Sequence, residues 1–189
     1  MSAASYEQLP ADLPVPEDDG AAAHLPGTVM PSITLPATSG ETVDLASLGH
    51  PRAIVYVYPM TGTPGVPLPE GWDQIPGARG CTPESLGFRS HYEGLAGLGA
   101  VVYGLSSQTP AEQAEAAARL ALPFPLLSDS GLVLAERLGL PTFAAGGAVR
   151  YKRLTLVLSS GRIEHVFYPA FPPDKHAAQV LAWLREHPA

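Results

Sequence analysis

The sequence of 189 residues is poor in cysteine and contains no cluster of basic residues. Because Cys81 is the only cysteine, no disulfide can form within the chain, and the fold needs no oxidising compartment. Lys and Arg number 11 against 18 Asp and Glu, and the resulting net charge of −7 argues against a nucleic-acid-binding surface. The sequence lacks an apolar run long enough to span a bilayer, and no signal peptide is visible. We therefore expect a cytoplasmic protein that binds neither nucleic acid nor membrane.

Patterns typical of metal and cofactor sites are also missing. The six histidines show no paired ligand spacing, which argues against a metal site. Neither a Gly-rich phosphate loop after a strand nor a Cys-x-x-Cys motif is present. We expect no metal and no cofactor.

The apolar content of 46% is that of a globular protein, and the length suits one domain with an appended arm. Residues 1–26 are rich in Ala and Pro and carry an acidic cluster at residues 17–19, which predicts an arm or a mobile tail. Residues 27–189 form the predicted domain. A docked arm is the alternative, and the apolar side chains available for docking are Tyr6, Leu9, Leu13 and Val15.

Apolar periodicity and turn residues predict the element order β-α-β-α-β-α-β-β-α behind a small N-terminal hairpin. The hairpin covers residues 32–45; strands are predicted at residues 53–58, 100–106, 124–127, 153–158 and 163–168, and helices at 81–98, 109–120, 130–138 and 174–184. The continuous run at residues 53–58 is typical of a strand buried on both faces. This order predicts an α/β fold, with a mixed central sheet, helices on both faces, two parallel early strands and an antiparallel final hairpin.

Cys81 precedes a predicted helix in the stretch Gly80-Cys81-Thr82-Pro83-Glu84. Pro83 suits a first helical turn, where the missing N–H has no partner to lose. Free N–H groups and the helix dipole favour a thiolate at such a position, so Cys81 is a candidate nucleophile. A free cysteine can also be a small buried hydrophobe without reactivity. Position alone leaves both interpretations open.

The loop at residues 59–80 is dense in Pro and Gly and joins a buried strand to this helix. Structureless connections of such length inside a compact domain are uncommon and are usually functional. Trp72 in this loop favours a simple role, in which its ring fixes the loop to the core. A role in docking a reductant or forming a subunit contact stays open.

Several motifs in this order resemble the peroxiredoxins, and within them the bacterioferritin-comigratory, or Q-type, branch of the AhpC/TSA and redoxin proteins. The first is Pro59-Met60-Thr61-Gly62-Thr63-Pro64-Gly65, followed by the Cys81 stretch and by Gly87-Phe88-Arg89. Leu122-Pro123-Phe124-Pro125-Leu126-Leu127-Ser128-Asp129 is similar to the third-strand segment of that branch, and Arg153-Leu154-Thr155-Leu156 to its Arg-x-Thr strand. The resemblance covers residues 27–187.

The resemblance implies a thioredoxin-like fold and an antioxidant thiol peroxidase that reduces hydrogen peroxide and organic hydroperoxides. Cys81 would be the peroxidatic nucleophile that passes to sulfenic acid, and Arg153 would favour the thiolate and polarise the peroxide. Thr63 would hold the peroxide with its hydroxyl, and Pro59 would shield the pocket. Glu84 would orient the arginine.

The sequence departs from the Q-type pattern first at residues 66–80, which intervene between Thr-Pro-Gly and the cysteine. We favour a loop that leaves and returns, keeping Pro59 and Thr63 near Cys81. The alternative is that residues 76–80 form the true approach, with Ala78 where the threonine hydroxyl should be.

The second departure is Leu86, which occupies the position where many relatives carry a resolving cysteine. Reduction of the sulfenic acid then requires an external thiol, either a thioredoxin-like protein or a low-molecular-weight thiol, in a one-cysteine (1-Cys) mechanism. The protein would be a monomer or a homodimer. Two rival functions remain: a cysteine hydrolase that pairs Cys81 with a distant histidine such as His165, and a non-enzymatic binding or holdase module.

Overall fold

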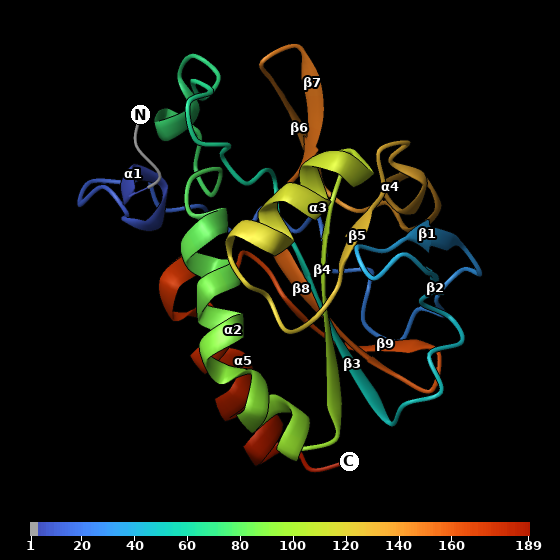
Figure 1. Ribbon diagram of the computed structural model, residues 1–189. Coiled ribbons are helices and arrows are strands. Elements are labelled where there is room, and N and C mark those ends of the chain that lie inside the picture. Colours follow the sequence, from blue (N-terminus) through green and yellow to red (C-terminus); the bar gives the residue numbers. More distant parts are fainter. Residues whose placement is uncertain (1–3) are drawn as a thin grey trace.

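The computed structural model describes residues 4–189, and its fold is a central five-stranded sheet flanked by helices, with two separate two-stranded sheets (Figure 1). The helices are α1 (Ala4–Glu7), α2 (Cys81–Gly97), α3 (Pro110–Arg119), α4 (Val133–Leu138) and α5 (Pro173–Glu186), with a 3-10 turn at Trp72–Gln74. The strands are β1 (Thr34–Pro36), β2 (Thr42–Asp44), β3 (Arg52–Val57), β4 (Ala100–Ser106), β5 (Leu126–Ser128), β6 (Thr142–Ala145), β7 (Ala148–Tyr151), β8 (Leu154–Ser159) and β9 (Arg162–Phe167).

The central sheet has the strand order β5-β4-β3-β8-β9. Strand β3 pairs in parallel with β4 and antiparallel with β8, and β8 forms an antiparallel hairpin with β9. The predicted mixed α/β sheet is therefore confirmed, including the parallel early pair and the antiparallel final hairpin. The predicted N-terminal hairpin is the separate two-stranded sheet of β1 and β2.

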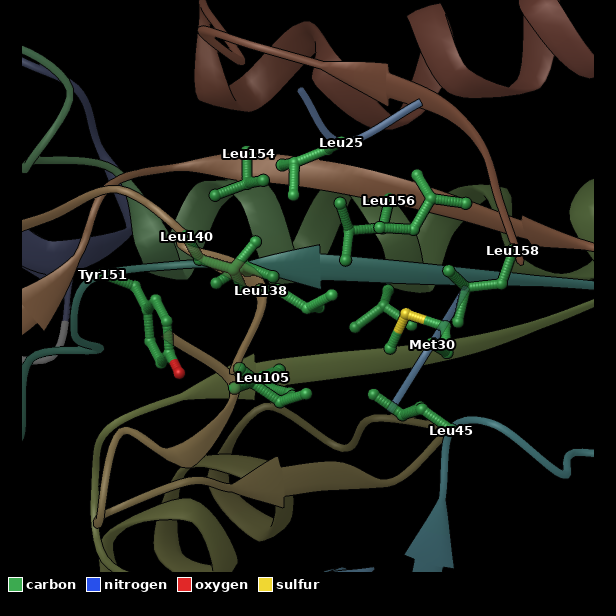
Figure 2. Packing of buried hydrophobic residues seen from close by; sticks show 14 of the residues in the cluster. Leu25, Met30, Leu45, Leu105, Leu138, Leu140, Tyr151, Leu154, Leu156 and Leu158 are labelled. Atoms are coloured by element: carbon green, nitrogen blue, oxygen red, sulfur yellow. The ribbon is translucent and has the colours of Figure 1, made fainter. Parts of the chain in front are cut away.

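Strand β3 is buried along its whole length because both faces of the sheet are covered. Ile54, Tyr56 and Tyr58 belong to the core on the face that carries α2, α3 and α5. Val55 and Val57 point to the opposite face, into a core that includes Leu side chains of α4, of β8 and of the N-terminal region (Figure 2). Because a core covers each face of the sheet, the residues that alternate between the two faces from Ala53 to Val57 all lack charge.

The N-terminal arm is docked on the domain over the part that the structure describes. Tyr6 is 3% exposed, and Ala22 and Leu25 are buried in the core. Val15, which the sequence offered as a docking residue, is instead 65% exposed. Helix α1 lies beside the beginning of α2, so the arm reaches the region of Cys81 (Figure 1).

The hairpin of β6 and β7 was not predicted from the sequence. Gly146 and Gly147 both have positive φ and form its two-residue turn, in which Ala145 pairs with Ala148. The hairpin projects from the body (Figure 1), and its Phe143 ring lies 5.9 Å from the ring of Trp72. Trp72 is 2% exposed, so it fixes the inserted loop against this hairpin.

Most element bounds differ from the prediction by one or two residues. The largest shift is in α4, which begins at Val133 rather than Ser130; β5 begins at Leu126 rather than Phe124, and β8 begins at Leu154, one residue after Arg153. Among the helices of residues 4–189, none has the length and apolar character needed to cross a bilayer.

Candidate active site

Cys81 is the first residue of α2 and lies at the end of the inserted loop. Gly80 precedes it as the N-cap with φ of 111°, a left-handed conformation that favours glycine. Its carbonyl accepts the first helical hydrogen bond from the N–H of Glu84 at 3.0 Å. Pro83 fits in this first turn as predicted, because its ring replaces an N–H that would have no partner. The helix therefore begins where the sequence indicates.

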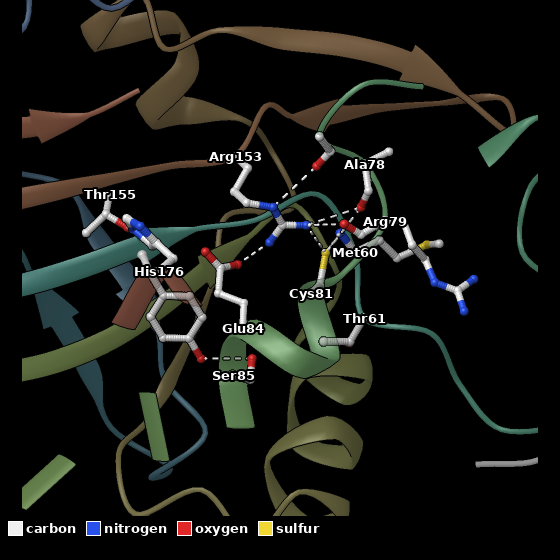
Figure 3. A network of polar contacts seen from close by, with 12 residues as sticks. Met60, Thr61, Ala78, Arg79, Cys81, Glu84, Ser85, Arg153, Thr155 and His176 are labelled. Atoms are coloured by element: carbon white, nitrogen blue, oxygen red, sulfur yellow. Dashed lines mark hydrogen bonds and ion pairs between the residues drawn. The ribbon is translucent and has the colours of Figure 1, made fainter. Parts of the chain in front are cut away.

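Arg153 lies one residue before β8 and places its guanidinium beside Cys81. Its Nη2 lies 3.1 Å from Cys81 Sγ, and the side chain of Arg153 is 1% exposed (Figure 3). Backbone carbonyls of the returning loop also accept hydrogen bonds from the guanidinium: Nε donates to Gly77 at 3.3 Å, and Nη2 donates to Ala78 at 3.2 Å and to Arg79 at 3.3 Å. This fork of donors fixes the guanidinium beside the sulfur.

Glu84 forms a buried ion pair with Arg153. Its Oε2 accepts from Arg153 Nη1, while its Oε1 is buried without a hydrogen-bond partner. Burial raises the pKa of Glu84 from 4.5 to about 7, and Arg153 opposes that rise. The single guanidinium thus faces two acids, the carboxyl of Glu84 and the thiol of Cys81.

The surroundings of Cys81 act on its thiol in opposite directions. Burial is the largest influence and raises the pKa of Cys81, whereas the charge of Arg153 is the next largest and lowers it. The N–H of Met60 donates to Sγ at 3.4 Å and also lowers this pKa, and the carbonyl of Ala78 lies 3.6 Å from Sγ. The thiol is therefore held by one cation and one backbone donor in a site that otherwise disfavours charge.

Three of the predicted site residues, Cys81, Glu84 and Arg153, contact one another. The other two are placed differently. Pro59 is buried just after β3, and its chain neighbour Met60 contacts the sulfur. Thr63 is half-buried, and its carbonyl accepts a turn hydrogen bond from Val66 at 3.0 Å. Within residues 4–189 its hydroxyl makes no hydrogen bond to any member of the cluster.

The stretch that begins at Pro59 and the returning segment 76–80 both contact the thiol of Cys81. Met60, from the stretch that begins at Pro59, supplies an N–H, and Ala78, from the returning segment, supplies a carbonyl. Ala78 has no hydroxyl, so the position three residues before Cys81 offers only backbone polarity. These backbone contacts were missed by sequence analysis because a backbone group leaves no mark in residue type.

Histidine does not activate Cys81 in the part of the chain that the structure describes. The ring of His165 stacks on Trp183 with centroids 4.6 Å apart, and His176 contacts Thr155 rather than the sulfur. No histidine there makes a hydrogen bond to Cys81. The Cys–His pair that a cysteine hydrolase requires is therefore not formed.

Comparison with known proteins relates this arrangement to one family. The chain matches the redoxin family over residues 25–181. It is 31% identical over 165 residues to peroxiredoxin Bcp of Escherichia coli K12, covering 85% of this chain and 96% of that protein. The crystal structure of peroxidoxin BcpB from Mycobacterium tuberculosis covers 88% of this chain and 100% of that one, with a TM-score of 0.70 and 26% identity. Peroxiredoxin Q of Xanthomonas campestris covers 88% and 98%, with a TM-score of 0.67 and 23% identity, and supports the fold.

Proposed function

The chain belongs to the redoxin family as a peroxiredoxin of the Bcp or Q type, and on this premise we propose that Cys81 reduces hydroperoxides by a one-cysteine mechanism. The observation that carries the proposal is the 3.1 Å contact between Arg153 Nη2 and Cys81 Sγ at the start of α2. A fixed cation beside a thiol at a helix N-terminus is the arrangement that generates a nucleophilic thiolate.

In the first step the thiolate of Cys81 attacks one oxygen of the hydroperoxide. A sulfur–oxygen bond forms, the oxygen–oxygen bond breaks, and its electron pair leaves with the second oxygen, which takes a proton and departs as water or alcohol. Sulfur is oxidised to sulfenic acid, and the peroxide is reduced. Arg153 stabilises the negative charge as it passes from sulfur to the leaving oxygen.

Arg153 is essential to this step because burial acts against the thiolate. Burial raises the pKa of Cys81, and Arg153 is the largest influence that lowers it. Glu84 would hold the guanidinium in place through the buried ion pair. We assign to Pro59 the shielding of the thiol from the β3 side.

The second step requires a thiol from outside the chain, since Cys81 is the only cysteine and Leu86 stands at the resolving position. One external thiol condenses with the sulfenic acid to a mixed disulfide and releases water. A second external thiol attacks that disulfide, which regenerates Cys81 and leaves the two external sulfurs oxidised. The monomeric or homodimeric state and the cytoplasmic location remain predictions, which gel filtration and cell fractionation would test.

Stopped-flow mixing of the reduced protein with hydrogen peroxide tests the proposal directly. We expect one equivalent of peroxide to be consumed per chain, with dimedone trapping a sulfenic acid that mass spectrometry assigns to Cys81. Without dimedone or thiol, excess peroxide should carry Cys81 on to sulfinic acid, because no second cysteine can intercept the sulfenic acid. Cys81→Ser is the control that should consume no peroxide. Rapid peroxide consumption by Cys81→Ser would refute the assignment.

A further inference from the structure

Tyr6 of the N-terminal arm forms part of the wall of the space beside Cys81. A cavity of about 10 Å³ reaches the cysteine, and its walls include Tyr6, Met60, Leu68 and Trp72. That volume is near the minimum of roughly 10–15 Å³ needed to hold one water molecule. A small peroxide comes close to this size, whereas an alkyl or aryl hydroperoxide needs one of the walls to move.

Tyr6 is the wall that can move at the lowest cost. Trp72 is buried against Phe143 of the projecting hairpin, and Met60 follows the buried residues Tyr58 and Pro59 after the end of β3. Tyr6 instead belongs to α1, a helix of only four residues, which is too short to be stable by itself and can open locally when its side-chain contacts are lost.

Three contacts hold Tyr6 over the cavity. Its hydroxyl donates to the carbonyl of Val66 in the inserted loop at 2.6 Å. The guanidinium of Arg79 lies 5.7 Å from the centroid of its ring. The ring also lies on Gly62, where an added Cβ would stand 2.7 Å from Tyr6 Cδ1.

Gly62 supports a specific fit between the arm and the site. Its φ lies outside the left-handed region, so backbone conformation does not require glycine there. Close approach of the Tyr6 ring does require it. The absence of a side chain at Gly62 and the position of the Tyr6 ring are therefore two parts of one contact.

We propose that Tyr6 determines which hydroperoxides reach Cys81 by size: the closed arm admits hydrogen peroxide, and bulky organic hydroperoxides react only from conformations in which Tyr6 is displaced. This inference rests on the proposed peroxidase function and adds to it a specificity-determining residue that does not itself contact the reacting sulfur. Leu68 and Trp72 of the inserted loop form another side of the same opening.

The test compares the full-length protein with Tyr6→Ala, Tyr6→Phe and the control Val15→Ala, which changes an exposed side chain of the same arm. Second-order rate constants are measured with hydrogen peroxide and with cumene hydroperoxide. In Tyr6→Ala the ratio of the cumene to the hydrogen peroxide constant should rise at least about fivefold, the population change expected from losing one hydrogen bond and its packing. Tyr6→Phe keeps the ring without the bond to Val66 and should give a smaller rise; Val15→Ala should give none.

Alkylation of Cys81 separates failure of this inference from failure of the proposed function. Reaction with iodoacetamide and with fluorescein maleimide compares a small and a bulky reagent without any peroxide chemistry. Tyr6→Ala should accelerate the bulky reagent more than the small one, and Tyr6→Phe carries the test if Tyr6→Ala does not fold. Unchanged ratios for both hydroperoxides and both reagents would overturn the role of Tyr6. A protein that reacts with neither hydroperoxide would instead refute the peroxidase, and the alkylation ratio would still decide on Tyr6.

Discussion

Arg153 and Glu84 form an ion pair in which the side chains are 1% and 0% exposed. Such a buried pair costs desolvation energy, and it persists only where further hydrogen bonds hold its members. Arg153 has these bonds in three backbone carbonyls and in Cys81. Glu84 has none for Oε1. Arg153 is therefore the member of the pair with more hydrogen bonds, and one of its donors contacts the sulfur of Cys81.

Replacement of Arg153 should slow the reaction with peroxide strongly. Arg153→Ala removes the cation that lowers the pKa of the Cys81 thiol, so we expect the rate constant at neutral pH to fall by about 100-fold or more. The alkylation rate of Cys81, followed against pH, should show the thiol titrating at higher pH than in the wild type. Arg162→Ala, at an exposed position of β9, is the control.

Loss of Arg153 also leaves Glu84 buried without a partner, at a cost of roughly 3–5 kcal/mol in folding free energy. Arg153→Lys therefore accompanies the alanine variant, because it keeps the charge and loses the fork of donors. Its rate should lie between those of the wild type and Arg153→Ala. A wild-type rate in Arg153→Ala would remove Arg153 from the mechanism.

Glu84 should make the protein less stable as pH rises through the neutral range. Burial raises its pKa in the folded state from 4.5 to about 7. Between these two pH values the folded protein keeps a proton that the unfolded chain has already released. Stability from this group is fully present below about pH 4.5 and is lost as pH rises towards 7. Glu84→Gln lacks this titration. The urea midpoint should therefore fall more from pH 5 to pH 8 in the wild type than in Glu84→Gln. Equal falls in the two proteins would contradict the raised pKa.

Sequence analysis predicted the central sheet because burial on both faces leaves a direct mark on residue type. The run of apolar residues in β3 and that in β4 located two neighbouring parallel strands within one residue of their bounds. The hairpin of β6 and β7 was missed although Gly146-Gly147 between short apolar stretches is a hairpin signal. Its strands are half-exposed and alternate weakly, so the turn was the only strong sign.

The proximity of side chains in the candidate site was predictable, whereas the contacts made by backbone groups were not. Cys81, Glu84 and Arg153 are brought together as the resemblance implied, although 72 residues separate the cysteine from the arginine. Ala78 and Met60 contact the sulfur through backbone groups, which any residue type supplies. The docking of Tyr6 on Gly62 depends on packing between distant segments, and neither residue alone indicates it.

His176 should make the protein less stable in acid. The ring is buried and its Nε2 lies 2.7 Å from Thr155 Oγ1, and burial lowers the pKa of His176 from 6.5 to about 4. The folded state therefore holds the ring neutral where the unfolded chain protonates it. Stability from this group is fully present above pH 6.5 and is lost as pH falls towards 4.

Urea denaturation of the wild type and of His176→Gln at pH 7 and pH 5 measures this contribution. Glu84 contributes in the opposite direction over this range, so the comparison is between proteins: the change in midpoint from pH 7 to pH 5 should be more destabilising in the wild type than in His176→Gln, which does not titrate. His50→Gln, at an exposed position, should follow the wild type. An equal fall in all three proteins would place the acid-sensitive group elsewhere.

Gly62→Ala should open the site in the same way as removal of the Tyr6 ring. The new Cβ would stand 2.7 Å from Tyr6 Cδ1, closer than real Cβ contacts, so the ring must leave its position. The ratio of cumene hydroperoxide to hydrogen peroxide rate constants should rise, as in Tyr6→Ala. Gly97→Ala, whose Cβ would enter open space at the end of α2, is the matched control and should leave the ratio unchanged.

Tyr6→Ala and Gly62→Ala both break the contact between the Tyr6 ring and Gly62. The double variant Tyr6→Ala/Gly62→Ala should therefore show no larger rise than either single variant. Full additivity of the two effects would mean that Gly62 acts on the site by a route other than Tyr6.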